Sequence, residues 1–271
     1  MLISSVIFVL QETLEAALLI SVLMAISHQQ SLKWLFVSLL AGALLSFIYA
    51  SNMHQVSEWF DYVGQEVINA TLHATITLSI ILFSWSLSRS KRHSQNKIPT
   101  LYFISSAASV TFAITLEGSE ILIYFSSFLQ EGNQQQTVAI GSSVGFAIGI
   151  SIGILLFYIL RALPASLSHY VPIFLLALFA GNMLSQFALQ LTQADWIPAA
   201  QAVWDTSEWL PESSIAGKLL YALIGYEATP SLIQIICYLM GTGLVLAFSI
   251  IRSPSKITNQ TAQENFDSKI S

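Results

Sequence analysis

Charged residues are scarce in this chain of 271 residues: only 9% are Asp, Glu, Lys or Arg, whereas 54% are hydrophobic. A soluble globular domain carries about 25% charged residues. The mean hydropathy is +0.67, and a water-soluble fold of this size could not bury so many apolar side chains. The composition excludes a soluble enzyme, a nucleic-acid-binding protein and a disordered regulator, and it predicts an integral membrane protein.

Cysteine is almost missing as well. The single Cys237 excludes a disulfide framework, an iron–sulfur site and a thiolate metal cage. The five histidines are scattered along the chain and form no local metal-binding pair. No Walker motif is evident, so we expect no ATP hydrolysis.

Long apolar runs dominate what is present. A membrane span needs about 20 mostly apolar residues. Seven segments meet this length: residues 3–27, 32–50, 66–87, 101–129, 137–160, 170–191 and 231–251. We expect helices, because isolated strands cannot satisfy their backbone hydrogen bonds in lipid. The first segment lacks a basic leader and carries two glutamates, so we do not expect a cleaved signal peptide.

The basic residues predict how the spans are oriented. If the connections are numbered alternately, one side of the membrane holds Lys33, Arg89, Lys91, Arg92, Lys97, Arg161, Arg252, Lys256 and Lys269. Lys218 alone lies on the other side. Because Lys and Arg accumulate in cytoplasmic loops, we expect the N-terminus outside and the C-terminus inside.

Four glutamates lie within two of the apolar runs: Glu12 and Glu15 in the first, and Glu117 and Glu120 in the fourth. A spacing of three places both carboxylates of a pair on one helix face. With a rise of about 1.5 Å per residue, both pairs lie near the middle of the membrane. Each carboxylate there costs about 2.5–3.5 kcal/mol on insertion scales, and neither span holds a Lys or Arg to neutralise it.

Intramembrane acids indicate function, and three uses are open: a cation site, a proton relay, or protonated packing groups. The first and fourth spans run in opposite directions, so the motif recurs on antiparallel helices, as in an inverted 3+3 repeat with a midplane site. Carboxylate oxygens suit hard cations, and the ligand types alone leave ferric iron, calcium, magnesium and manganese open. The favoured interpretation is a cation site.

The predicted domain organisation follows from this repeat. A seven-helix transmembrane domain covers residues 1–252, with repeat one at about 1–90 and repeat two at about 100–192. An exterior loop at 192–230 leads to the seventh helix at 231–251. The polar residues 253–271 are expected to form a disordered cytoplasmic tail.

Several motifs together resemble one known family. Gln11-Glu12-Thr13-Leu14-Glu15 and Leu116-Glu117-Gly118-Ser119-Glu120 resemble the Arg-Glu-Gly-x-Glu hallmark of the high-affinity iron permeases, also called oxidase-dependent iron transporters. Residues 64–70, Gly-Gln-Glu-Val-Ile-Asn-Ala, resemble the family's Gly-Gln-Glu-Leu-Phe-Asn-Ala. Residues 193–198, 204–207 and 225–231 resemble its last exterior loop and the start of its seventh helix. The similarity extends to about residue 251, and the bacterial branch looks closest.

The resemblance implies a multi-pass transporter, not an enzyme, that imports iron, in the ferric form, across the plasma membrane or the bacterial inner membrane. By position, it implies Glu12, Glu15, Glu117 and Glu120 as metal ligands, with transported iron and no cofactor. Its expected contacts are membrane lipid and an extracytoplasmic iron oxidase or iron-binding protein, with no nucleic acid. The hallmark arginines are replaced by Gln11 and Leu116, while all four glutamates are kept. We expect one or more of these glutamates to hold a proton without metal and to release it on binding.

Weaker candidates are Glu66, Asp205 and Glu208. Glu66 either complements the positive end of the third helix or forms an entrance site. Asp205 and Glu208, three residues apart in the last exterior loop, either cap the chain there or capture metal or a partner. For His73, Asn182, Gln186 and the glycine stripe at residues 141, 145, 149 and 153, packing is the favoured interpretation.

Rival functions are open at this point. One is a transporter or proton-coupled exchanger of another hard divalent cation such as manganese, and another is a metal sensor that does not transport. A membrane-embedded di-iron oxidase is disfavoured, because such sites usually need Glu-x-x-His pairs and neither motif supplies a histidine.

Overall fold

The structure is a computed structural model, and it describes residues 2–27, 32–92, 100–128 and 135–250. Its seven long apolar helices are α1 (Leu2–Ile26), α2 (Lys33–Ser51), α5 (Gly64–Arg92), α6 (Thr100–Ser127), α7 (Gln135–Ala162), α8 (Tyr170–Gln193) and α10 (Leu232–Ile250). Three shorter helices are α3 (Met53–Ser57), α4 (Trp59–Tyr62) and α9 (Ile215–Ile224). Within the described ranges no strand forms beyond one isolated bridge, Ala202–Ser231. The predicted all-helical, seven-span fold is confirmed. The predicted tail, residues 253–271, lies outside the described residues.

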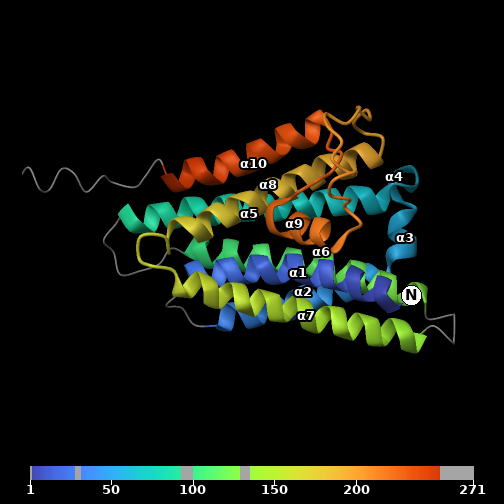
Figure 1. The fold of residues 1–271 in the computed structure, drawn as a ribbon, viewed down its shortest axis with the longest axis horizontal. Coiled ribbons are helices and arrows are strands. Elements are labelled where there is room, and N and C mark those ends of the chain that lie inside the picture. Colours follow the sequence, from blue (N-terminus) through green and yellow to red (C-terminus); the bar gives the residue numbers. More distant parts are fainter. Residues whose placement is uncertain (1, 28–31, 93–99, 129–134, 251–271) are drawn as a thin grey trace, which may run out of the picture.

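The long helices lie side by side as one bundle, and its two ends differ (Figure 1). At one end lie the N-terminus, α3, α4 and the connection from α8 to α10. We call this the N-terminal end; α1, α5, α7 and α10 begin there, and α2, α6 and α8 finish there. The distinction matters because the polar cavities described below lie toward this end.

Helix pairing agrees with the symmetry expected of an inverted repeat. The first span packs on the fifth (α1 on α7), and the fourth on the second (α6 on α2). The third packs on the fourth, the sixth on the first, and the third and sixth pack on each other. Exchanging spans one to three with spans four to six leaves this set of pairs unchanged. The pairing therefore supports the predicted inverted 3+3 repeat, in which the seventh helix, α10, is an addition packed on α8.

The glycine stripe of α7 packs directly on α1. Gly141, Gly145, Gly149 and Gly153 are all buried. A Cβ on Gly149 would lie 2.8 Å from Cβ of Thr13, and one on Gly153 would lie 2.6 Å from Cβ of Ala17. Because these glycines have no side chains, α7 can approach α1 closely. This confirms that the glycine stripe serves helix packing. The close contact fixes the helix that carries the first glutamate pair.

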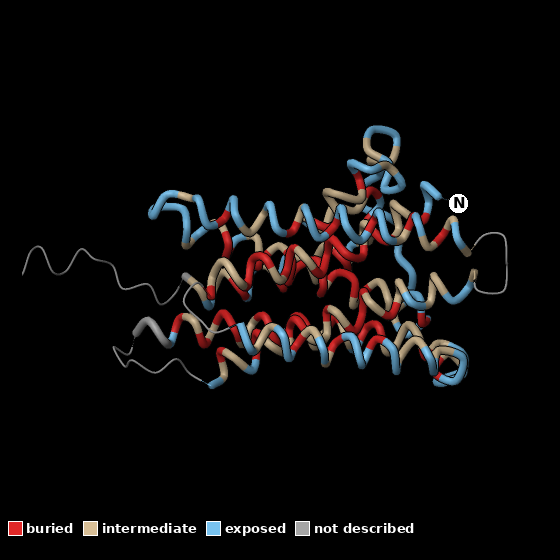
Figure 2. The backbone as a smooth tube through the Cα atoms, turned by 90° about the horizontal axis from the view of Figure 1, so that it is seen from below, coloured by how far each residue is buried: buried red, intermediate tan, exposed pale blue. Residues whose placement is uncertain are grey.

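Large apolar side chains fill the bundle from its middle, at the level of Leu116 and Met183, to the end opposite the N-terminal end. We call this set the apolar cluster, and its most deeply buried members include Leu19, Leu23, Ile76, Ile80, Phe83, Val110, Leu116, Leu176 and Met183. They come from α1, α5, α6 and α8. Figure 2 shows the buried backbone of these helices running along the middle of the bundle, with exposed residues on the outer helices. The cluster closes the interior of this half.

The segment predicted as an exterior loop contains α9, which packs into the bundle. The Ser214 hydroxyl accepts a hydrogen bond from the Gly217 amide and caps the start of α9. Gly225, at φ 68°, ends it in the left-handed conformation that glycine adopts without strain. Ala222 is buried against Leu14 and Leu18 of α1. One face of α9 is therefore covered by the bundle, and α9 reaches the depth of the first glutamate pair.

Candidate functional site

The two glutamate pairs overlap in depth within the bundle, and Glu12 of one pair lies level with Glu117 of the other. Glu12 is ten residues from the start of α1, and Glu117 is ten residues from the end of α6. Since these helices pack together in opposite directions, both residues lie about 15 Å from the N-terminal end, at about 1.5 Å per residue. Glu12, Glu15 and Glu117 are at least 95% buried, and Glu120 is half-buried. The antiparallel helices therefore bring the two motifs to the same level.

The four carboxyl groups interact with one another. Those of Glu12 and Glu117 lie within hydrogen-bonding reach of each other. The charges of Glu12 and Glu120 also act on Glu15. Across the described residues, however, no three His, Cys, Asp or Glu side chains converge closely enough to hold a metal ion as they stand. The carboxyls form one cluster that would have to draw together around a cation.

The two positions that depart from the family hallmark have different surroundings. Gln11 hydrogen-bonds Glu15 one turn further along α1. Leu116 is buried within the apolar cluster. A positive charge comes instead from Lys218 on α9, whose ammonium group attracts Glu12. The chain thus places a lysine from a distant segment near the first motif.

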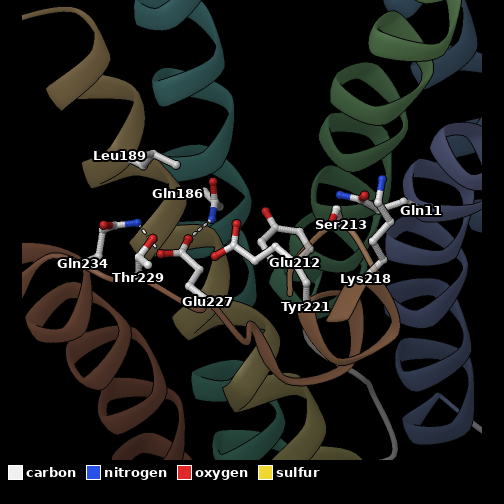
Figure 3. A pocket seen from close by; sticks show the side chains of 10 residues that line it. All are labelled: Gln11, Gln186, Leu189, Glu212, Ser213, Lys218, Tyr221, Glu227, Thr229 and Gln234. Carbon is white, nitrogen blue, oxygen red and sulfur yellow. Dashed lines mark hydrogen bonds between the residues drawn. The ribbon is translucent and has the colours of Figure 1, made fainter. Parts of the chain in front are cut away.

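A cavity of about 500 Å³ lies beside Lys218, between α1, α8 and the segment around α9 (Figure 3). We call it the α9 cavity, and its polar lining includes Gln11, Gln186, Glu212, Lys218, Tyr221 and Glu227. Glu212 and Ser213 are exposed, so the cavity meets the surface, while Gln11 adjoins the buried glutamates. It is a polar path from the surface to the level of Glu12.

Hydrogen bonds fix both acids of the α9 cavity. Glu227 accepts from the Gln186 amide at 2.6 Å and from the Gln234 amide at 2.5 Å (Figure 3). Glu212 accepts from the Ala228 backbone amide at 2.6 Å. Burial raises the pKa of Glu227, and the nearby Glu212 charge acts in the same direction. These oxygens are held toward a space that a cation could enter.

Glu66 lines a second cavity, of about 390 Å³, together with Glu120. We call it the α5 cavity; its other polar lining residues are Gln65, Asn69, Tyr124, Gln190 and Gln193. The Tyr49 hydroxyl donates to the side-chain oxygen Oδ1 of Asn69 at 2.9 Å, and the side-chain amide of Asn69 donates to Glu120 at 3.4 Å. The structure therefore places Glu66 and Glu120 on one polar cavity, and it also places Glu66 in the first turn of α5, as the helix-end alternative expects.

Asp205 and Glu208 are not brought to either cavity. Both are exposed. The Asp205 carboxylate accepts from the Ser207 hydroxyl at 2.5 Å and from its backbone amide at 2.9 Å. These bonds, the hydroxyl first, lower the pKa of Asp205. The geometry is that of a local turn cap, the alternative considered for Asp205.

His73, Asn182 and Gln186 are all buried in the bundle, but their surroundings differ, because Gln186 also lines the α9 cavity. His73 is buried, with Nδ1 2.7 Å from the Asn69 carbonyl oxygen. Asn182 is also buried, and neither of its amide atoms has a partner. Gln186 does bond across elements, but to Glu227 of the loop.

Sequence reasoning did not single out Tyr221, Glu212 or Glu227 as site residues. Glu227 was visible inside the motif at residues 225–231, but nothing local linked it to the buried glutamates. Tyr221 lines the α9 cavity, and the charges acting on its hydroxyl include those of Glu15, Glu117 and Glu12. Burial, followed by these charges, raises the pKa of Tyr221 well above its usual range. Its position depends on how α9 folds back into the bundle.

Comparison with known proteins identifies the family. The sequence pattern of the iron permease FTR1 family matches residues 2–253, which is nearly the whole chain. No curated protein and no solved structure matched in the corresponding comparisons. Members of this family are permeases, and the seven apolar helices agree with a multi-pass membrane protein. The chain therefore belongs to the iron permease FTR1 family.

Proposed function

We propose that this protein imports iron, in the ferric form, across a bacterial inner membrane, and that Glu12, Glu15, Glu117 and Glu120 are its ligands. The observation that carries this proposal is the cluster of four carboxyls, three buried and one half-buried, from two antiparallel helices, at the depth that two polar cavities reach. Anionic oxygen ligands suit a hard cation such as ferric iron.

The charge distribution supports a path from the N-terminal end. Glu212 and Glu227 line the α9 cavity, and Glu66 lines the α5 cavity. Clefts lined by negative charge raise the local concentration of cations. With the N-terminus outside, as the distribution of Lys and Arg predicts, both cavities face the exterior. Inward movement of a trivalent ion is then favoured by about 7 kcal/mol per 100 mV, at about 2.3 per charge.

The apolar cluster supports alternating access. Below the glutamates, Leu19, Ile80 and Phe83 are almost completely buried. Packing at this density leaves no polar route for a cation. Release on the other side therefore requires the repeats to move relative to each other, as in transporters with a midplane site. An extracytoplasmic iron oxidase or iron-binding protein as donor remains a prediction from sequence.

Radiolabelled iron uptake in cells that lack their own iron importers tests the proposal. Wild type, Glu15→Gln and Glu120→Gln would receive ferric or ferrous iron, with manganese as competitor. We expect uptake by wild type from the ferric supply and none by either variant. Glu208→Gln is the matched control, because its carboxylate is exposed and lies outside both cavities.

Other outcomes identify the rivals. Manganese transport without iron transport would support a divalent cation transporter or exchanger. Iron binding by the purified protein without flux would support a sensor. Uptake that survives in both glutamine variants, at equal expression, would overturn the assignment of the ligands.

A further inference from the structure

Tyr221 lines the α9 cavity, and it belongs to α9, a helix whose ends and packing are well defined. The Ser214 cap and the left-handed Gly225 define the ends of α9. Ala222, the next residue after Tyr221, is 2% exposed and packs on Leu14 and Leu18 of α1. These two residues flank Glu15 in the sequence of α1. Tyr221 is therefore held at the depth of the buried glutamates.

The side chain of Tyr221 points into the cavity rather than into lipid. Figure 3 shows it between the side carrying Gln11 and the side carrying Glu227. Lys218 lines the same cavity from three residues earlier, on the same face of α9. Tyr221 thus lies between the acidic mouth of the cavity and the carboxyl cluster at its base.

We propose that Tyr221 is a further oxygen ligand of the transported ion and that it selects ferric iron over divalent cations. This inference rests on the proposed function, because it adds a ligand to the four glutamates. Among the described residues, no three His, Cys, Asp or Glu side chains lie close enough together to hold a metal ion. A phenol oxygen in the cavity would add a donor of another kind to this incomplete set.

The chemistry accounts for the selectivity. When the ion binds, the phenol O–H bond breaks, its proton leaves to water in the cavity, and an iron–oxygen bond forms without oxidation or reduction. A phenolate is a hard anionic donor, which suits ferric iron. A bound cation favours the deprotonated form of its ligand, and a trivalent ion does so more strongly than a divalent ion. Divalent cations would therefore gain less from Tyr221.

Spectroscopy of the full-length protein in detergent tests the ligand directly. Ferric citrate would be added to wild type and to Tyr221→Phe, and the tyrosinate-to-ferric charge-transfer band would be followed by visible absorption and resonance Raman scattering. We expect the band in wild type and not in the variant. The matched control is Tyr238→Phe, since the Tyr238 hydroxyl donates to the Ile224 carbonyl outside this cavity. That variant should keep the band.

Uptake measures the selectivity. In Tyr221→Phe the ratio of ferric iron uptake to manganese uptake should fall by about tenfold, a typical loss when a supporting group of a metal site is removed. Size-exclusion elution and melting temperature equal to those of wild type would establish that the variant folds. A folded variant that keeps the band, or keeps the wild-type ratio, overturns the proposal.

The glutamate variants separate this inference from the proposed function. If Glu15→Gln and Glu120→Gln abolish iron binding while Tyr221→Phe leaves band and ratio unchanged, only the assignment of Tyr221 fails. If both glutamine variants bind and transport ferric iron normally, the proposed carboxylate site fails, and the inference about Tyr221 fails with it.

Discussion

The two halves of the bundle are built from the same helices but differ in polarity: one holds acids and polar cavities, and the other holds packed apolar side chains. Along α1, Glu12 and Glu15 lie at the level reached by the cavities, and Leu23 lies deeper in the apolar cluster. Along α5, Asn69 lines a cavity, whereas Phe83 is completely buried. The polar cavities thus lie toward the N-terminal end, whereas packed apolar side chains lie deeper along the same helices. In the proposed transport cycle, this packed half would have to open.

The apolar half does contain polar groups, but most are small hydroxyls bonded to nearby carbonyls. Ser105 donates to the Leu101 carbonyl oxygen at 2.6 Å, and Ser109 donates to Ser105 at 2.9 Å. Ser88 instead bonds a neighbouring helix, at the Phe248 carbonyl oxygen. Because these hydroxyls are satisfied, they add little cost to close packing. They would also offer polar surface if the helices separated.

The largest expected effect comes from removing an acid at the boundary between the halves. Glu117→Gln should reduce iron uptake by more than about 100-fold, because loss of even a supporting group costs metal sites 10–100-fold. The wild-type protein should release protons when metal binds, since carboxyl groups lose their protons on becoming ligands and those of Glu12 and Glu117 lie close together. Isotope uptake and proton release measured with a pH dye check both expectations.

Equal iron affinity in Glu117→Gln and wild type would contradict the site. Expression and melting temperature serve as controls, because neutral glutamine can replace a protonated acid in packing.

The next-largest effect is expected from a substitution within the apolar cluster, and it tests how tightly the cluster is packed. Phe83→Ala should lower the free energy of unfolding by about 3–5 kcal/mol, since it leaves a cavity in the apolar cluster. Phe36, which is 64% exposed and faces outward from α2, gives the matched control. Phe36→Ala should change the melting temperature little. Equal melting temperatures for the two variants would show that the cluster is not tightly packed.

The contact between α1 and α7 should be less sensitive but still measurable. Gly149→Ala places a methyl group against Thr13 and should cost about 1–3 kcal/mol through overpacking. Gly243→Ala is the control, because a Cβ there meets nothing within 4 Å. Thermal unfolding in detergent should separate the two variants, and iron uptake should fall only in the first. Similar behaviour of both would remove the argument that the stripe positions the glutamates.

The smallest effect is expected in the outer cavity. The pKa of Glu227 is raised by burial, so Glu227 takes up a proton as the pH falls, at a higher pH than an exposed glutamate would. Its negative charge is then lost and cation attraction weakens. Uptake by wild type should therefore fall as the medium is acidified, and Glu227→Gln should show several-fold lower uptake with a flatter pH profile. An unchanged profile would show that Glu227 does not attract the ion.

Local sequence properties determined much of this protein. The scarcity of charge and seven apolar runs predict the spans, because each helix satisfies its own backbone wherever it lies. The Glu-x-x-Glu spacing places each pair on one helix face, and the cost of burying acids marks them as functional. Likewise, the glycines of α7 form a stripe whatever surrounds them.

Only the tertiary structure decided what meets the glutamates. Tyr221 and Lys218 follow Glu15 by about two hundred residues in the sequence, yet α9 brings them to the same cavity. The sequence of a ten-residue apolar helix does not by itself determine whether the helix lies on the surface or within a bundle. That choice follows from the buried contact of Ala222 with Leu14 and Leu18. The position of Asp205 was likewise decided by its neighbours, because two bonds from Ser207 hold its carboxylate in a surface turn. Periodicity and spacing are local and can be read from the chain, whereas contacts between distant segments depend on packing free energy summed over the whole fold.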